Sequence, residues 1–99
     1  MTITTQRDGS HITLVIAGRV DTNTSTQLQG EILRAFQGAR QLTLDFSQVS
    51  YISSAGLRAL LIGQKTALTK GASMELIHLQ PAVMTVLSLS GFDSILNIK

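Results

Sequence analysis

The sequence contains no cysteine and no tryptophan, and its aromatic residues are three phenylalanines and one tyrosine. Without cysteine, neither a disulfide nor a thiolate metal site is available within these 99 residues. The few aromatic side chains offer a poor platform for stacking nucleic-acid bases. The net charge is only +2, and the lysines and arginines are scattered without forming a basic run. We therefore expect no nucleic-acid partner.

Long hydrophobic runs are also missing. The longest, Leu14–Ala17 and Ala59–Ile62, are far shorter than the ~20 residues that a membrane-spanning helix needs. The first residues, from Met1 to Arg7, contain no apolar stretch of signal-peptide length. These features predict a cytoplasmic protein that is not inserted directly into a membrane.

The composition is that of one globular domain covering residues 1–99. Apolar residues make up 43% of the chain and charged residues 14%, which is enough apolar material to build a core. His11 and His78 fall in separate expected strands, and no cluster of metal-ligating residues accompanies either of them. We therefore expect no metal site.

The N-terminal pattern predicts a β-hairpin. Residues 2–7 and 11–17 are typical of strands, and in the second strand Ile12, Leu14 and Ile16 recur with a period of two. The intervening Asp8-Gly9 pair favours a tight type I′ turn. The two strands should therefore be antiparallel neighbours.

Two longer helices are expected, at residues 24–37 and 54–70. In the first, Thr24 and Gln27 have the spacing of a capping box, and Gly38 and Gly71 are suited to the positions that follow the two helices. The inward-facing residues of the second helix are expected to be Leu57, Leu60, Leu61, Gln64, Ala67 and Leu68. The remaining expected elements are a strand at 42–46, a turn at 47–50, a strand at 74–79, a helix from Pro81 ending at Gly91, and a short strand at 95–98.

This order of elements indicates an α/β domain with a mixed, mostly parallel sheet of four to five strands, an N-terminal hairpin and three main helices. In such sheets, functional groups gather beyond the carboxyl ends of the parallel strands. The two loops expected there are residues 18–21 and 45–54. The topology therefore predicts one polar patch that contains Asp21, Asp45, Ser53 and Ser54.

The two consecutive serines before the second long helix are the most informative feature. Serine is a favoured N-cap because its hydroxyl oxygen accepts a hydrogen bond from a free amide of the first helical turn. Only one of the two serines can be the cap. If Ser53 is the cap, Ser54 occupies the first helical position and its hydroxyl faces solvent.

Residues 42–61, LTLDFSQVSYISSAGLRALL, resemble the signature of STAS-domain anti-sigma factor antagonists. Residues 18–21 resemble the first-loop motif of that family, and residues 91–93 resemble its segment after the third helix. The resemblance spans nearly the whole chain and implies a single STAS domain over residues 1–99.

The resemblance also implies specific roles for residues. The phosphoacceptor of the family falls on Ser54, with Ser53 as second choice, because many members carry Asp at the position of Ser53. Asp21 matches the acidic residue of the first loop, and Gly56 matches the glycine that follows the acceptor. The implied partner-binding residues are Asp21, Ser53, Ser54, Ala55, Gly56 and Arg58.

The implied function is partner switching. The unphosphorylated antagonist binds an anti-sigma factor, which releases the sigma factor. The anti-sigma factor is a GHKL-type serine kinase that phosphorylates the antagonist and breaks the complex, and a metal-dependent serine phosphatase restores it. ATP and metal belong to those enzymes, so the antagonist itself needs no cofactor and is not an enzyme.

Several alternatives remain open at the level of sequence. Asp21 is as well suited to capping its loop before Thr24 as to contacting a partner, whereas Asp45 is better suited to holding its loop through backbone amides than to partner contact. Gly56 is suited to close packing within the fold or to the approach of a partner, and Arg58 to contact with solvent, partner or phosphate. The whole chain could instead be a free-standing STAS subunit of a lipid-transporting ABC assembly. An enzyme with a nucleophilic Ser54 is disfavoured, because the sequence lacks a Gly-x-Ser-x-Gly elbow and a histidine placed to act as base.

Overall fold

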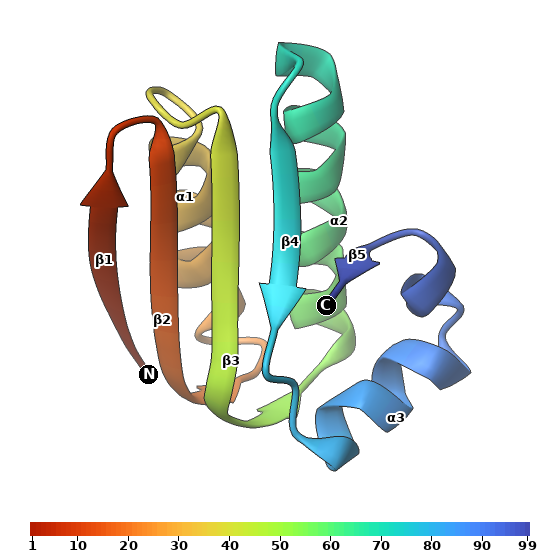
Figure 1. The fold of residues 1–99 in the computed structure, drawn as a ribbon. Coiled ribbons are helices and arrows are strands. Elements are labelled where there is room, and N and C mark those ends of the chain that lie inside the picture. Colours follow the sequence, from red (N-terminus) through yellow and green to blue (C-terminus); the bar gives the residue numbers. More distant parts are fainter.

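Five strands form one sheet whose spatial order follows the chain (Figure 1). The computed structural model describes all residues, 1–99. Strand β1 pairs with β2 in antiparallel orientation, and every later pair, β2–β3, β3–β4 and β4–β5, is parallel. The predicted mixed sheet with an N-terminal hairpin is therefore confirmed. The strands are β1 (Thr2–Asp8), β2 (His11–Val20), β3 (Gln41–Ile52), β4 (Ser73–Ile77) and β5 (Asn97–Ile98).

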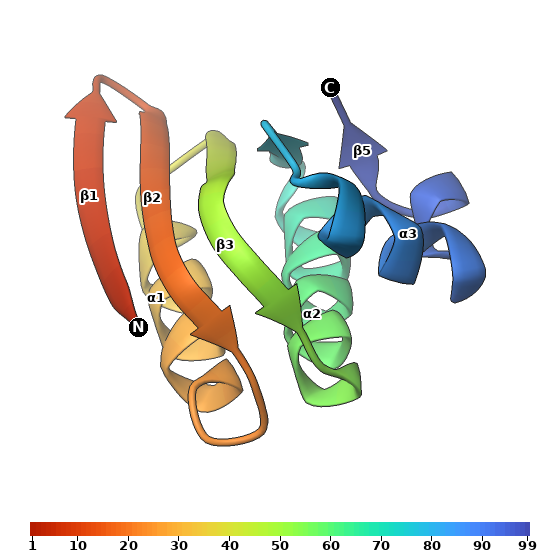
Figure 2. The same ribbon diagram turned by 90° about the horizontal axis from the view of Figure 1, so that it is seen from below.

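The two longer helices cover one face of the sheet. They are α1 (Ser25–Ala35) and α2 (Ser54–Lys70), which lie side by side behind the strands in Figure 1. Helix α3 (Pro81–Leu89) lies apart from them, beyond the carboxyl end of β4, and packs against β3 and the short 3₁₀ helix η1 (Phe92–Ser94). Figure 2 shows the same arrangement from below, with α3 at the side of the sheet away from β1.

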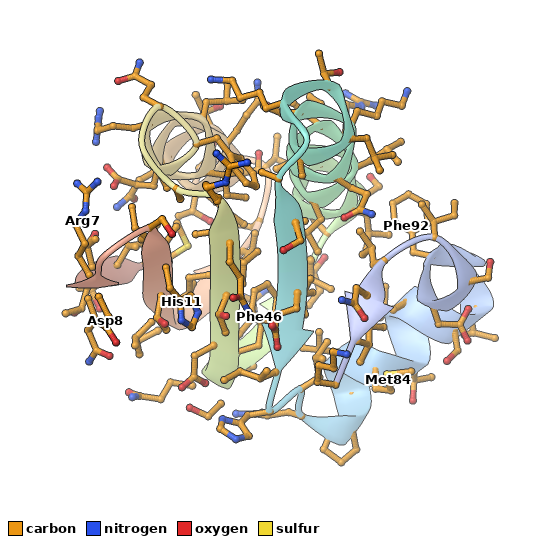
Figure 3. All side chains as sticks on the ribbon, turned by 45° about the horizontal axis from the view of Figure 1, so that its top comes forward. Arg7, Asp8, His11, Phe46, Met84 and Phe92 are labelled. Carbon is orange, nitrogen blue, oxygen red and sulfur yellow. The ribbon has the colours of Figure 1, made fainter.

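The core lies between the sheet and its helices. Ile12, Leu14 and Ile16 are buried, whereas the residues between them are partly exposed, which confirms the predicted alternation. The packing is close at Gly63 of α2, where an added Cβ would lie 2.9 Å from the Ile32 side chain of α1 and 2.9 Å from Met74 Sδ. Figure 3 shows buried Phe46 near the middle of the sheet and Arg7 and Asp8 on its outer strand.

The hairpin forms with a different turn from the one expected. Asp8 pairs with His11, so the central turn residues are Gly9 and Ser10. Gly9 has a φ of 62°, but Ser10 does not have a positive φ. A type I′ turn requires positive φ at both central positions, whereas a type II′ turn requires it only at the first, where glycine is preferred. The predicted type I′ turn is therefore wrong, and the observed pattern is that of type II′.

Strand β3 is much longer than predicted. It continues through the segment that was expected to be a turn and ends at Ile52, with Val49 and Ile52 buried. Two register shifts against β2 accommodate the polar residues of this segment. A β-bulge leaves one residue unpaired without ending the strand, so Ser47 and Ser50 do not interrupt the ladder.

Three further details differ from the predictions for the helices. Thr24 makes no side-chain cap, so the capping box is absent. Helix α1 ends at Ala35 with Phe36 as its cap, so Gly38 lies beyond the predicted position, whereas Gly71 does follow α2 with a φ of 67°. Leu68 was expected to face inward but is 70% exposed.

Candidate functional site

The loops after β2 and β3 leave the sheet side by side. Val20 and Ile52 are paired at the ends of these strands, and the Ser53 amide donates a hydrogen bond to the Val20 carbonyl oxygen at 2.8 Å. Asp21 and Ser53 therefore follow two directly paired residues. The predicted convergence of these two loops is confirmed, and it brings Asp21 to the start of α2.

Ser53 caps α2. Its backbone is extended, and its Oγ accepts a hydrogen bond from the Gly56 amide at 3.2 Å. Ser54 is the first helical residue, and it is exposed. Because Ser53 already provides the cap, the Ser54 hydroxyl has no structural partner in the chain and remains open to solvent.

Asp21 holds the loop that leads into α1. Its Oδ1 accepts hydrogen bonds from the Thr24 and Asn23 amides, each at 3.0 Å, and Thr24 Oγ1 lies 3.1 Å away. The bond from the Thr24 backbone, helped by Arg19 nearby, lowers the pKa of the Asp21 carboxyl below its usual value. The loop-capping role considered for Asp21 is thus realised in the structure.

Asp45 does not belong to this patch. It pairs with Val15 and Ile77 and lies several positions before the end of β3, because the strand does not stop at Phe46. Its carboxylate accepts the Ser47 amide at 2.9 Å and lies 3.4 Å from His78 Nδ1. Burial alone would raise its pKa, but these hydrogen bonds outweigh burial and lower it. The prediction that Asp45 joins Asp21, Ser53 and Ser54 is therefore wrong.

The first turn of α2 contains the other predicted site residues. Ala55 is partly buried and Arg58 is exposed. Gly56 is buried, and a Cβ added to it would lie 2.7 Å from Ile52 Cγ1 and 2.8 Å from Val20 Cγ1. Close internal packing therefore requires glycine at this position. Contact of Gly56 with a partner stays a prediction.

The structure also reveals a pair that was missed in the sequence. The Arg19 guanidinium lies 4.2 Å from the centre of the Tyr51 ring, and both residues are exposed. They face each other because β3 has an extra residue between the partners of Gly18 and Arg19. No pattern in the sequence gives the position of this bulge, so the pairing could not be predicted.

Ser54 lies in neither a metal-binding cluster nor a cavity. No three residues of the His, Asp and Glu types lie together as a metal site would require. One open cavity of about 180 Å³ is present, but it is lined by residues of β1, β2 and α1 and includes none of the site residues. None of the helices combines the length and apolar character needed to cross a membrane.

Known proteins of similar sequence match almost the whole chain. Residues 3–97 match the family described as "Mlab, STAS domain". BtrV of Bordetella bronchiseptica, named as a candidate anti-sigma factor antagonist, is 32% identical over 96% of this chain and 83% of its own. An anti-sigma-B factor antagonist of Listeria monocytogenes is 27% identical over 95% of this chain and 83% of its own.

A solved structure shares the fold. The Bacillus anti-sigma factor antagonist SpoIIAA in its unphosphorylated form has a TM-score of 0.83 at 18% identity, over 99% of this chain and 88% of SpoIIAA. The phosphorylated form of SpoIIAA has a TM-score of 0.76. The sheet order, the hairpin and the match over residues 3–97 agree with one another, and this chain is a member of the STAS domain family.

Proposed function

We propose that this chain is an anti-sigma factor antagonist that acts as a cytoplasmic switch. In this proposal the unphosphorylated form binds an anti-sigma factor and so releases a sigma factor, and phosphorylation of Ser54 breaks the complex. The observation that carries the proposal is the exposed, unpartnered hydroxyl of Ser54 beside a serine that already caps the helix. The names of the Bordetella and Listeria relatives support the same function.

A phosphate at Ser54 would be compatible with the fold. It adds about −1.5 to −2 charges at the positive end of α2, where the free amides and the helix dipole favour an anion. The first turn of α2 contains no acidic residue that would repel the phosphate. The net charge of +2 would fall to about zero. The principal effect of the modification is therefore on the surface that a partner meets.

Ser53 is the less suitable acceptor. Its Oγ is engaged with the Gly56 amide, and its side chain is partly buried at the helix start. Phosphorylation there would alter the capping contact itself, so the modification would act directly on the helix start. Ser54 makes no such structural contact, so its modification would leave the Ser53 cap of the helix unchanged.

The proposed partners supply the chemistry. A GHKL-type serine kinase that is also the anti-sigma factor brings ATP, and a metal-dependent serine phosphatase resets the switch. The chain contributes a binding surface, for which we propose Asp21, Ser53, Ser54, Ala55, Gly56 and Arg58, and it performs no catalytic step. Arg58 is exposed one helical turn after Ser54 and is therefore positioned to contact a partner or a phosphate.

The test is phosphorylation by a purified GHKL-type serine kinase from the same genome with Mg-ATP, followed by peptide mass spectrometry. We expect one phosphate on the wild type, its loss in Ser54→Ala and its retention in the matched variant Ser53→Ala. The phosphorylated protein should no longer bind the kinase. Constant binding to the ATPase subunit of a transporter, without phosphate in cells or in vitro, would instead establish the constitutive-subunit alternative.

A further inference from the structure

Helix α2 has an unusual distribution of charge. Between Phe46 and Met74 there is no aspartate or glutamate, so the helix carries only positive charges, at Arg58, Lys65 and Lys70. Lys70 has a role in the fold, because its Nζ donates a hydrogen bond to the Phe36 carbonyl oxygen at 3.1 Å. Arg58 and Lys65 are exposed, and neither takes part in the two ion pairs of the molecule. Their charges therefore remain unneutralised.

These free charges lie on the same side of the helix as Ser54. Successive residues of an α-helix are rotated by about 100°, so Ser54, Arg58 and Lys65 fall within a narrow sector. The opposite side faces the core and is made of small and apolar residues, all of them buried: Gly56, Ala59, Leu60, Gly63 and Ala67. Ser54, Arg58 and Lys65 are all exposed to solvent. The cations thus form a solvent-facing row that begins at the proposed switch residue.

Two leucines complete this surface. Leu68 is 70% exposed, and Leu61 is partly exposed in the same sector of the helix. A single exposed leucine is ordinary on a protein surface. Here, however, the leucines alternate with the free cations along about 15 Å of helix, from Arg58 to Leu68. We call Ser54, Arg58, Leu61, Lys65 and Leu68 the α2 face.

We infer that the α2 face is a docking surface for an acidic protein surface with an apolar patch, and that this surface belongs to the anti-sigma factor. The inference rests on the proposed function and adds the chemistry of the contact. Charge complementarity selects the occupant, because two unpaired cations without any neighbouring acid favour carboxylates on the partner. Leu61 and Leu68 give the contact the apolar component that protein interfaces need.

The position of Ser54 at the end of this row explains how one phosphate could release the partner. Ser54 and Arg58 are four residues apart on a helix, the spacing at which an anion and a following cation attract each other. A phosphate on Ser54 would pair with Arg58 and withdraw that charge from the partner. It would also repel the carboxylates that the α2 face attracts. One modification would thus remove an attraction and add a repulsion.

The test measures the affinity of the purified GHKL-type kinase for the wild type and for Arg58→Glu/Lys65→Glu. The matched control is Arg40→Glu, which reverses an exposed charge before the opposite end of β3. We expect the double variant to raise Kd by about tenfold or more at 0.1 M NaCl, and the control to stay within about twofold. Raising NaCl to 0.5 M should weaken wild-type binding. It should not weaken binding of the double variant, because salt screens the repulsion between its reversed charges and the acidic partner. Leu68→Ser should also weaken binding.

The outcomes separate the two claims. If the double variant binds as the wild type does, while phosphate on Ser54 still abolishes binding, the α2 face is not the docking surface and the proposed function stands. If the wild type neither binds the kinase nor is phosphorylated, the proposed function is rejected and the inference with it. Sedimentation with vesicles of phosphatidylglycerol and phosphatidylcholine, lost in the double variant while kinase binding is unchanged, would assign the face to a membrane instead.

Discussion

At the scale of single residues, the two serines at the start of α2 have different roles. One caps the helix, and the other is the proposed site of regulation. Ser53 accepts the Gly56 amide, and Ser54 projects its hydroxyl into solvent. A residue that both capped the helix and accepted phosphate would change the capping contact at each modification. Adjacent serines avoid this conflict, because the helix start stays capped in either state.

This division predicts that two neighbouring substitutions affect stability to different extents. Ser53→Ala removes the cap and should lower the free energy of unfolding by about 1 kcal/mol. Ser54→Ala removes no hydrogen bond, and alanine is a good helix former, so the change should stay within about 0.5 kcal/mol. Urea denaturation followed by circular dichroism compares the two variants. Equal losses for both would show that Ser54 has a structural role that the free hydroxyl does not indicate.

The lowered pKa of Asp21 predicts that the free energy of unfolding depends on pH. Its pKa is lowered in the folded state by the hydrogen bond from the Thr24 backbone, so the ionised carboxylate stabilises the fold. That contribution is fully present above the usual value of 3.8 and is lost as the pH falls through the lower, folded-state pKa. The difference in unfolding free energy between the wild type and Asp21→Asn should therefore be positive at pH 6 and shrink toward pH 2.

Urea denaturation across this pH range tests the point, with Asp93→Asn as control, since Asp93 is an exposed carboxylate in the distant η1 helix. The unfolding free energy of Asp93→Asn should depend on pH in the same way as that of the wild type. A constant difference between the wild type and Asp21→Asn at all pH values would show that only the shape of the Asp21 side chain matters, and not its charge.

At the scale of elements, the start of α2 is fixed by close packing on the ends of β2 and β3. Gly56 lies so near Ile52 and Val20 that a methyl group there must displace one of them. Gly56→Ala should therefore lower the unfolding free energy by about 1–3 kcal/mol. Gly30 of α1 has no atom within 4 Å of a built Cβ, so Gly30→Ala should instead stabilise by about 0.5–1 kcal/mol. In thermal unfolding, the melting temperature should fall for Gly56→Ala and rise for Gly30→Ala.

A shift in the same direction for both glycine variants would contradict the packing argument. The pair is well matched, because both glycines lie within helices and the substitution is identical. Gly56→Ala should also weaken kinase binding more than its loss of stability explains, if the first turn of α2 moves away from the sheet. Gly30 is exposed and has no atom within 4 Å of a built Cβ, so it serves as the control for this second effect.

The elements also show what the sequence could and could not predict. Helix α2 begins and ends as predicted, at Ser54 and Lys70, because a capping serine and a left-handed glycine mark both ends locally. The end of β3 was not predictable, since its bulges depend on pairing with β2, which no local pattern encodes. The same bulges placed Asp45 far from the site and brought Tyr51 opposite Arg19.

The inward stripe of α2 illustrates the same limit. Leu57 and Leu60 were predicted to be buried and are, but Leu61 and Leu68 of the same predicted stripe lie on the solvent-facing side of the helix. The buried side of the helix instead uses Gly63 and Ala59, whose small size lets α1 and β4 approach. Small residues are weak signals in a hydrophobic pattern, so the true orientation of the helix becomes clear only from packing.

At the scale of the whole molecule, the topology gathers the regulatory residues and keeps them away from the core. Parallel β2 and β3 end together, and α2 starts where they end. The proposed phosphoacceptor therefore lies at one end of the sheet, outside the hydrophobic cluster that holds the strands and helices together. This placement favours a switch that changes the surface and leaves the fold as it is.

The corresponding prediction concerns the chain with phosphoserine installed at position 54. Its amide NMR signals should shift only around the strand ends and the first turns of α2, because at ~0.15 M salt the field of an exposed charge is screened within about 8 Å. Its unfolding free energy should be equal to that of the wild type or higher by up to about 1 kcal/mol, from the helix dipole. Shifts that spread into β1 or α3, or a loss of stability, would mean that phosphate acts by rearranging the fold. Because the Ser54 hydroxyl has no internal contact to break, the structure argues for release by charge at the surface.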